Sequence, residues 1–406
     1  MAGKRAFDSE GAQHASEAVR FNARTLKKLQ AAITKDPEID LADQFPTRYS
    51  ERLMEMRTTI ESPPKKTRTA DEDIRESICP SDPVEIVFPL SDAVAKLLEP
   101  ISQTAEGLPL SQRLFEVLKS SEILWKAPFY RKGVFKCSSE IVVKAIRNME
   151  HNTEYTALQY LNRHKPNILV PKPLGLVRMG RISLIFMTHM GSTTLGEVWH
   201  TLESYQKTSI SNQLNTILAD LRTLPFTEGT PLGGVAGEGC RDLRRHVRVS
   251  ETPIVSLEDF ETFLFSSPHP GGNVFIKFLR QLSPSVTNHS GPRIVFTHGD
   301  IRPDNITVKL TDNDYMVSGI LDWEYSGFYP DYYESVRCTN CLRPYEEDDW
   351  FLYLPDCVSP TIYAQWWLLD RGIVLDIVRI QGMGPLTRPL RGTCGIDIAR
   401  TVDGTI

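Results

Sequence analysis

A short strand, a polar loop and a β-hairpin follow one another between residues 293 and 322, and no other part of the sequence constrains the fold as much. The strand is apolar and β-branched over 293–297, and the loop 298–305 is rich in Gly, Pro, Asp and Asn. Strand-like residues then continue through 306–321, interrupted by one polar turn, as in a hairpin. Because a hairpin reverses the chain, its end is expected to return to the loop before it.

Three oxygen-bearing side chains should meet in this arrangement. Asp300 and Asn305 lie in the loop, and Asp322 ends the hairpin. Phosphoryl transfer requires such a set, because a carboxylate orients the attacking hydroxyl and Mg²⁺, which prefers oxygen ligands, neutralises the phosphate charge. We therefore predict Asp300 as the catalytic carboxylate and Asn305 and Asp322 as magnesium ligands. The alternative is a polar turn with capping carboxylates only.

A lysine lies within a second β-branched strand, at residues 141–146. An isolated ammonium is costly to bury, so Lys144 needs a partner, and Glu154 on the following helix is well placed. Such a pair holds the α and β phosphates of the nucleotide in kinase chemistry. In the alternative interpretation, Lys144 extends to solvent at a strand edge.

The order of the other elements predicts an α+β fold with a small antiparallel-sheet lobe and a larger helical lobe. Two strands are expected at 174–179 and 182–190, the spacing of Thr194 and Glu197 is that of a capping box, and a longer helix is expected at 204–224. A cleft between two such lobes is where ligands usually bind.

Four segments are predicted along the chain. They are an N-terminal extension, partly helical or disordered (1–85), a sheet-rich N-lobe (86–190), a helical C-lobe with the polar loop (191–370) and a divergent C-terminal tail (371–406).

Composition excludes few functions. The chain has 406 residues and a formal net charge of -5, which does not indicate binding to nucleic acid or to an anionic membrane. No apolar run approaches the roughly 20 residues of a membrane-spanning helix, and no secretory signal is recognisable. We expect a cytoplasmic protein with neither of these partners, and the sequence does not indicate an oligomeric state.

These motifs resemble the aminoglycoside phosphotransferase and choline kinase-like family, within the protein-kinase-like two-lobe fold, and most closely its fungal-type members. The resemblance covers residues from about 110 to about 370. Its specific parts are 296–305, which resembles the catalytic loop, and 319–324, which resembles the metal-binding segment. The strand at 142–144 resembles the family more weakly.

The resemblance implies a kinase that transfers the γ-phosphate of ATP or GTP to a hydroxyl of a small-molecule acceptor, with Mg²⁺ as cofactor. The implied catalytic residues are Asp300, Asn305, Arg302 and His298. The implied metal ligands are Asn305 and Asp322. The implied nucleotide-binding residues are Lys144, Glu154 and, through the backbone beside adenine, Phe186, Met187 and Thr188.

Two other functions stay open. No glycine-rich loop precedes Lys144, where only Gly133 is available, so fewer backbone amides can hold phosphates and a nucleotide-binding pseudokinase or interaction module is possible. A protein kinase is less expected, because the loop reads His-Gly-Asp rather than His-Arg-Asp and Asp322 is followed by Trp323. Arg302 nevertheless occupies the place of a protein-kinase lysine.

Two charged clusters are candidates for the acceptor pocket, and a solvated surface is the alternative for both. The acidic cluster, which would attract a cationic acceptor, comprises Asp331, Glu334, Glu346, Glu347, Asp348 and Asp349. The basic cluster comprises Arg241, Arg244, Arg245 and Arg248.

Overall fold

The computed structural model describes residues 17–46, 49–58, 73–99, 107–127, 131–242, 248–266, 273–283, 292–312, 314–342 and 346–380. The chain divides into two compact units, residues 1–69 and 70–406. Most of the predicted tail, from residue 381 onward, and the first 16 residues of the predicted extension lie outside the described residues. No described helix is both long and apolar enough to cross a bilayer.

The first unit contains two helices, α1 (Glu17–Lys35) and α2 (Tyr49–Thr58). Phe21 of α1 stacks on Tyr49 with ring centroids 5.5 Å apart, and the Tyr49 hydroxyl donates to Asn22 Oδ1 at 2.7 Å. These contacts join the two helices into a hairpin.

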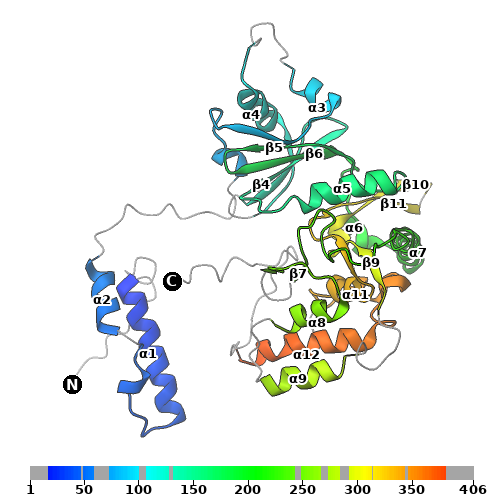
Figure 1. The fold of residues 1–406 in the computed structure, drawn as a ribbon. Coiled ribbons are helices and arrows are strands. Elements are labelled where there is room, and N and C mark those ends of the chain that lie inside the picture. The colour runs from blue at the N-terminus through cyan, green and yellow to red at the C-terminus, as the bar shows by residue number, and fades with distance from the viewer. Residues whose placement is uncertain are drawn as a thin grey trace. The chain divides into compact units, whose positions relative to one another are not determined.

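The second unit begins with a sheet lobe (Figure 1), whose described strands form one six-stranded sheet in the order β1-β5-β6-β4-β3-β2. All neighbouring strands are antiparallel, as predicted. The strands are β1 (Val84–Phe88), β2 (Glu122–Lys126), β3 (Lys132–Lys136), β4 (Ile141–Arg147), β5 (Pro173–Met179) and β6 (Ile182–Thr188). The helices α3 (Asp92–Leu97) and α4 (Leu110–Ser120) belong to the same lobe.

Alternation along the central strands separates two hydrophobic clusters on the two faces of the sheet. Val143 of β4 and Phe186 of β6 face one cluster, which contains Leu114 of α4. Their neighbours Val142 and Met187 face the other cluster. Both central strands are therefore buried on both faces, which explains their continuous apolar sequence.

The second cluster joins the sheet to the other lobe through α5 (Thr153–His164). Leu158 and Leu161 of α5 pack in the same cluster as residues of α7 (Ser204–Leu221) and of the hairpin β10 (Ile306–Thr311) and β11 (Asp314–Ile320). Accordingly, α5 lies between the sheet and this hairpin (Figure 1). The predicted hairpin and the predicted long helix are both confirmed.

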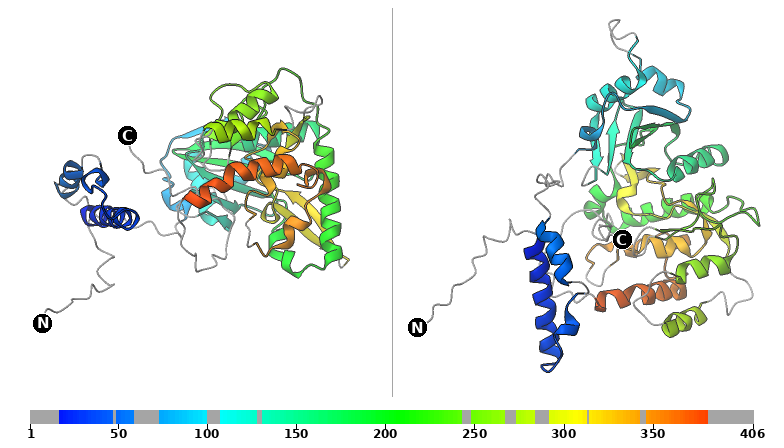
Figure 2. Two further views of the ribbon diagram at one scale, coloured as in Figure 1. Left: turned by 90° about the horizontal axis from the view of Figure 1, so that it is seen from below. Right: turned by 60° about the vertical axis from the view of Figure 1, so that its left-hand side comes forward.

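The C-lobe begins at α6 (Leu195–Val198), where the predicted capping box is confirmed by bonds between Thr194 and Glu197 of 3.4 and 2.9 Å. Further described helices belong to the C-lobe, and α8, α9 and α12 among them lie far from the sheet (Figures 1 and 2). They are α8 (Leu257–Phe265), α9 (Asn273–Gln281), α11 (Tyr333–Cys338) and α12 (Ala364–Ile380). The C-lobe also contains two short antiparallel strand pairs among its described residues. They are β9 (Ile294–Thr297) with β12 (Gly327–Pro330), and β7 (Arg241–Asp242) with β8 (Arg248–Val249).

Candidate active site

The hairpin places Asp322 against the polar loop, as expected. Ile306 pairs with Ile320 across β10 and β11, and the Leu321 amide donates to the Asn305 carbonyl at 2.7 Å. Asp322 then adopts a left-handed backbone conformation, with φ of 65°, which is rare for residues other than glycine. Strand β11 ends at Ile320, two residues earlier, and the Asp322 side chain contacts Lys144 of the sheet lobe.

The loop itself holds Asp300 and Asn305 together. The Asn305 side-chain amide donates to the Asp300 carboxylate and to the Asp300 carbonyl, both at 2.9 Å. Because the amide nitrogen faces Asp300, the oxygen Oδ1 of Asn305 remains for a cation. Arg302 Nε lies 3.5 Å from Asp300 Oδ2, so a guanidinium borders the same carboxylate.

His298 is buried, and both of its ring nitrogens are engaged. Nε2 lies 2.8 Å from the Leu321 carbonyl, and Nδ1 lies 3.1 Å from the Asp300 amide. A carbonyl only accepts and an amide only donates, so the proton is on Nε2 and Nδ1 accepts. This geometry favours a positioning role for His298, because the ring ties the Asp300 backbone to the end of the hairpin.

A buried carboxylate supports the loop from behind. Glu334 of α11 accepts from the His298 amide at 2.6 Å and from the Gly299 amide at 3.1 Å. Gly299 has φ of 85°, and a Cβ there would lie 2.6 Å from the Tyr325 carbonyl oxygen. Glycine is therefore required at this turn.

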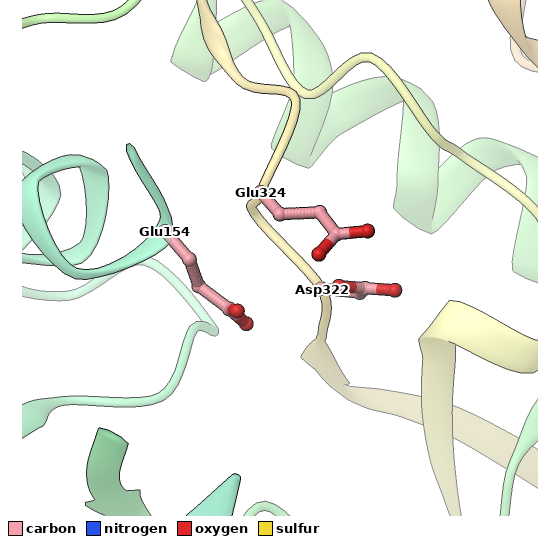
Figure 3. A group of neighbouring side chains, drawn as sticks. All are labelled: Glu154, Asp322 and Glu324. Atoms are coloured by element: carbon pink, nitrogen blue, oxygen red, sulfur yellow. The ribbon is translucent and has the colours of Figure 1, made fainter. Parts of the chain in front are cut away.

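A cluster of charged side chains joins the two lobes in front of the loop. Lys144 Nζ lies 2.7 Å from Glu154 Oε2 and 2.5 Å from Asp322 Oδ1, and Lys132 Nζ lies 2.5 Å from Glu324 Oε2. Figure 3 shows the three carboxylates, with Glu154 at the start of α5 and the other two on the segment after β11. Among the described residues, these three form the one acidic group close enough to hold a metal ion, with their oxygens within 4.8 Å.

Three carboxylates face two ammonium groups, so the cluster has an excess of negative charge. Burial alone would lower the pKa of Lys144, but Asp322, Glu154 and Glu324 outweigh it and hold that pKa well above its usual range. Burial would raise the pKa of Asp322, yet Lys144 and Lys132 lower it. Burial raises the pKa of Glu154 to about 7, the negative charges of Asp322 and Glu324 act in the same direction, and Lys144 opposes them. A divalent cation would balance this excess charge.

The segment expected beside adenine ends β6. Met187 pairs with Val142 of β4 on one side and with Pro173 of β5 on the other, and the Thr188 amide donates to the Lys172 carbonyl at 3.0 Å. Phe186 is buried in the sheet core. Thr188 also pairs with Ile141 of β4. All three residues therefore belong to the sheet, and their place beside adenine stays a prediction.

The acidic cluster predicted from the sequence is not one surface. Glu334 is buried under the loop, Asp349 accepts from Lys207 at 2.8 Å, and Asp331 lies 3.8 Å from Arg293. These three residues therefore have separate partners, and Glu334 does not reach the surface.

The basic cluster is also divided. Arg248 pairs with Asp242 at 3.0 Å, whereas Arg241 Nη1 donates to the Glu324 carbonyl at 3.1 Å. Arg244 and Arg245 lie outside the described residues. Of the two described members, only Arg241 reaches the candidate site.

Sequence reasoning missed two members of the site and one support. Glu324 had a signal, since it is a second carboxylate two residues after the predicted magnesium ligand Asp322, and Mg²⁺ prefers oxygen ligands. Lys132 had none, because the sequence does not reveal which side chain crosses from β3 to the other lobe. Glu334 was interpreted as surface acid because burial on so short a helix has no periodic signature.

Several known proteins are similar to this chain. A 64-residue stretch is 77% identical to oxopyrrolidines biosynthesis cluster protein G of Penicillium oxalicum and covers 13% of this chain. The match spans only 18% of the length of that relative. Among solved structures, an aminoglycoside 2'-phosphotransferase-IIIa mutant with GDP is 15% identical over 65% of this chain and 87% of its own, with a TM-score of 0.43. The streptomycin–ATP–APH(2")-IIa complex is 12% identical over 68% and 91%, with a TM-score of 0.42.

The family model described as the phosphotransferase enzyme family matches residues 147–352, just over half of the 406 residues. The matched region contains Glu154, the loop with Asp300 and Asn305, and the segment of Asp322. The chain therefore belongs to the phosphotransferase enzyme family.

Proposed function

We propose that this phosphotransferase transfers the γ-phosphate of ATP, or of GTP, to a hydroxyl of a small molecule. The observation that carries the proposal is the contact of Lys144 with both Glu154 and Asp322, at 2.7 and 2.5 Å. It aligns a phosphate-binding lysine of the sheet lobe with the segment that follows the Asp300 loop in the helical lobe. Phosphoryl transfer depends mainly on such positioning and charge stabilisation.

In this proposal, Asp300 accepts the proton of the acceptor hydroxyl. The Asn305 amide at 2.9 Å and the Arg302 guanidinium at 3.5 Å orient its carboxylate. Arg302 also faces the transferred phosphate, and His298 fixes the Asp300 backbone. A carboxylate with so many neighbours can accept a proton only along one direction, which selects the orientation of the hydroxyl.

The donor set fits Mg²⁺, which takes oxygen ligands. Asp322, Glu324 and the oxygen of Asn305 would hold it, and the excess negative charge of the carboxylate cluster supports this assignment. The ion would supply charge neutralisation at the β and γ phosphates. Lys144 would hold the α and β phosphates while Glu154 holds the lysine.

The nucleotide base requires open backbone near the end of β6. We propose that the base binds beside the end of β6, at Phe186, Met187 and Thr188 and along the chain that follows to residue 191. Lys132 follows the glycine-poor connection of β2 to β3, whose residues 128–130 lie outside the described ones. Its ammonium, 2.5 Å from Glu324, would compensate for missing glycine amides at the phosphates.

The acceptor is proposed only as a small molecule with a hydroxyl group. Because Glu334, Asp349 and Asp331 of the predicted acidic cluster have separate partners, one reason to expect a cationic acceptor is removed. The stretch shared with a protein named for an oxopyrrolidines biosynthesis cluster suggests including hydroxylated oxopyrrolidines in an acceptor panel. We further propose that residues 86–190 bind the nucleotide and residues 191–370 bind the acceptor.

A nucleotide turnover assay with Mg²⁺ tests the proposal, with water and a metabolite panel as acceptors. Asp300→Asn should lower turnover by about 10²- to 10⁴-fold while nucleotide binding is retained. Asp304→Asn is the matched control, because Asp304 is an exposed carboxylate of the same loop. Equal turnover by the wild type and Asp300→Asn, with nucleotide bound, would contradict the proposal.

The glycine-poor connection before Lys144 favours one alternative, a pseudokinase. Thermal stabilisation by ATP and Mg²⁺ without turnover on any acceptor would support it. Transfer of labelled phosphate to generic basic proteins would instead indicate a protein kinase.

A further inference from the structure

A glycine-rich loop at residues 233–239 crosses the C-lobe next to α5. The Gly233 amide donates to the Phe328 carbonyl at 2.8 Å, and the Phe328 amide donates back at 2.9 Å. A Cβ on Gly327 would lie 2.1 Å from the Gly233 oxygen, so the backbones are in direct contact. The loop is therefore fixed to β12 of the C-lobe.

One side chain of this loop reaches α5. Glu238 Oε1 accepts from the Thr156 hydroxyl at 2.5 Å, and Glu238 Oε2 accepts from the Ala236 amide at 2.8 Å. Thr156 is buried, and Glu238 is half-buried. The loop's own amide thus aims the carboxylate at the first turn of the helix that carries Glu154.

The same segment also reaches the opposite side of the candidate site. Arg241 Nη1 donates to the Glu324 carbonyl at 3.1 Å. The Tyr333 hydroxyl donates to the Arg241 carbonyl at 2.6 Å, which fixes this residue to α11. The segment therefore contacts both sides of the carboxylate cluster, at α5 and after β11.

The rest of α5 is held by other contacts. Its second half packs on the C-lobe, where Tyr160 stacks on Phe296 with centroids 5.7 Å apart. Its first turn also packs on the sheet lobe, where Tyr155 stacks on Phe88 at 4.5 Å. The Thr156–Glu238 hydrogen bond links this first turn to the C-lobe loop, two residues from Glu154.

We propose that Glu238 is a positioning residue, which holds the first turn of α5 through Thr156 and thereby keeps Glu154 on Lys144. This inference rests on the proposed function, because its consequence for activity requires that Lys144 hold phosphates. The hydrogen bond involves a charged acceptor, so its loss should weaken nucleotide binding about tenfold. The chemical step should change less, because Asp300 and its partners do not touch the loop.

The test compares Glu238→Ala with the isosteric Thr156→Val and with Thr156→Ser, which keeps the hydroxyl, in the full chain. Glu228→Ala is the control, because Glu228 is an exposed carboxylate just before the same loop. Hydrogen exchange of a peptide spanning residues 155–161 is measured without nucleotide. The KM for ATP with Mg²⁺ and the kcat are measured separately.

We expect Glu238→Ala and Thr156→Val to increase exchange in α5 and to raise the KM about tenfold with a smaller change in kcat. Thr156→Ser, which keeps the hydroxyl, should have the exchange and the KM of the wild type. The double variant Glu238→Ala/Thr156→Val should resemble the two single variants. Unchanged exchange in α5 for Thr156→Val would overturn the inference, even if Glu238→Ala did not fold. If the wild type binds no nucleotide, the proposed function fails, while the exchange measurement still decides whether Glu238 holds the helix.

Discussion

Replacing Lys144 by methionine tests the charge arrangement of the site most directly. The two side chains have similar length, so Lys144→Met removes the charge with little change in packing. The Lys144 side chain is 7% exposed and contacts Glu154, which is 5% exposed, and Asp322, which is 24% exposed. Loss of the ammonium leaves the buried Glu154 carboxylate without its cation and leaves Asp322 with Lys132 and Arg302 as neighbouring cations.

The expected cost follows from burial. Removing one partner of a buried ion pair usually costs about 3–5 kcal/mol, because the remaining charge is left uncompensated. Lys144→Met should lie in this range, whereas Glu154→Gln should cost less because Asp322 still neutralises the lysine. In the double variant Lys144→Met/Glu154→Gln, no carboxylate remains at position 154 to be left unpaired. The loss of unfolding free energy in the double variant should therefore be smaller than the sum of the two single losses by about 1–3 kcal/mol.

Urea unfolding of the four proteins in a metal chelator measures these free energies. Lys96→Met is the control, because Lys96 is exposed on α3 and should change stability by less than about 0.5 kcal/mol. A cost of Lys144→Met below about 1 kcal/mol, or strict additivity with Glu154→Gln, would refute the reasoning. It would mean that the ammonium is solvated and that the excess negative charge of the cluster has little energetic effect.

Three further predictions concern the support of the site and the folded state. Glu334→Gln should lower the free energy of unfolding by about 2–4 kcal/mol in urea titrations, because a neutral amide cannot accept equally from two buried amides. Cys79 is exposed whereas burial raises the pKa of Cys240 to about 12, so mass spectrometry should show alkylation of Cys79 in the native protein and of Cys240 only after unfolding. Burial opposes ionisation of Asp73, but bonds from Arg75 lower its pKa, so the stability it contributes is present above about pH 4 and is lost as the pH falls through the lowered value. Between about pH 5 and pH 2, the wild type should therefore lose more stability than Asp73→Asn in urea titrations, and equal losses would contradict this assignment.

The sequence by itself determined the local parts of the site. The hairpin at 306–321 could be predicted because strand periodicity and a polar turn are properties of neighbouring residues. A hairpin returns to its start, so the return of the chain before Asp322 to the loop of Asp300 and Asn305 could be predicted as well, and the Leu321 amide bonds to the Asn305 carbonyl at 2.7 Å. The pairing of Lys144 with Glu154 followed from the cost of burying an ammonium, and the structure confirms the contact at 2.7 Å.

Only the tertiary structure decided which residues from distant segments complete the site. Lys132 and Glu324 are 192 positions apart in the sequence, and Glu334 is 36 positions after His298, whose amide it binds. The contact of Glu238 with Thr156 likewise joins residues 82 positions apart. Periodicity reports the burial of each element, whereas these contacts depend on how two lobes and a loop pack against one another. For this reason the sequence indicated a phosphoryl-transfer site, while the charge balance around it and the supports behind it had to come from the fold.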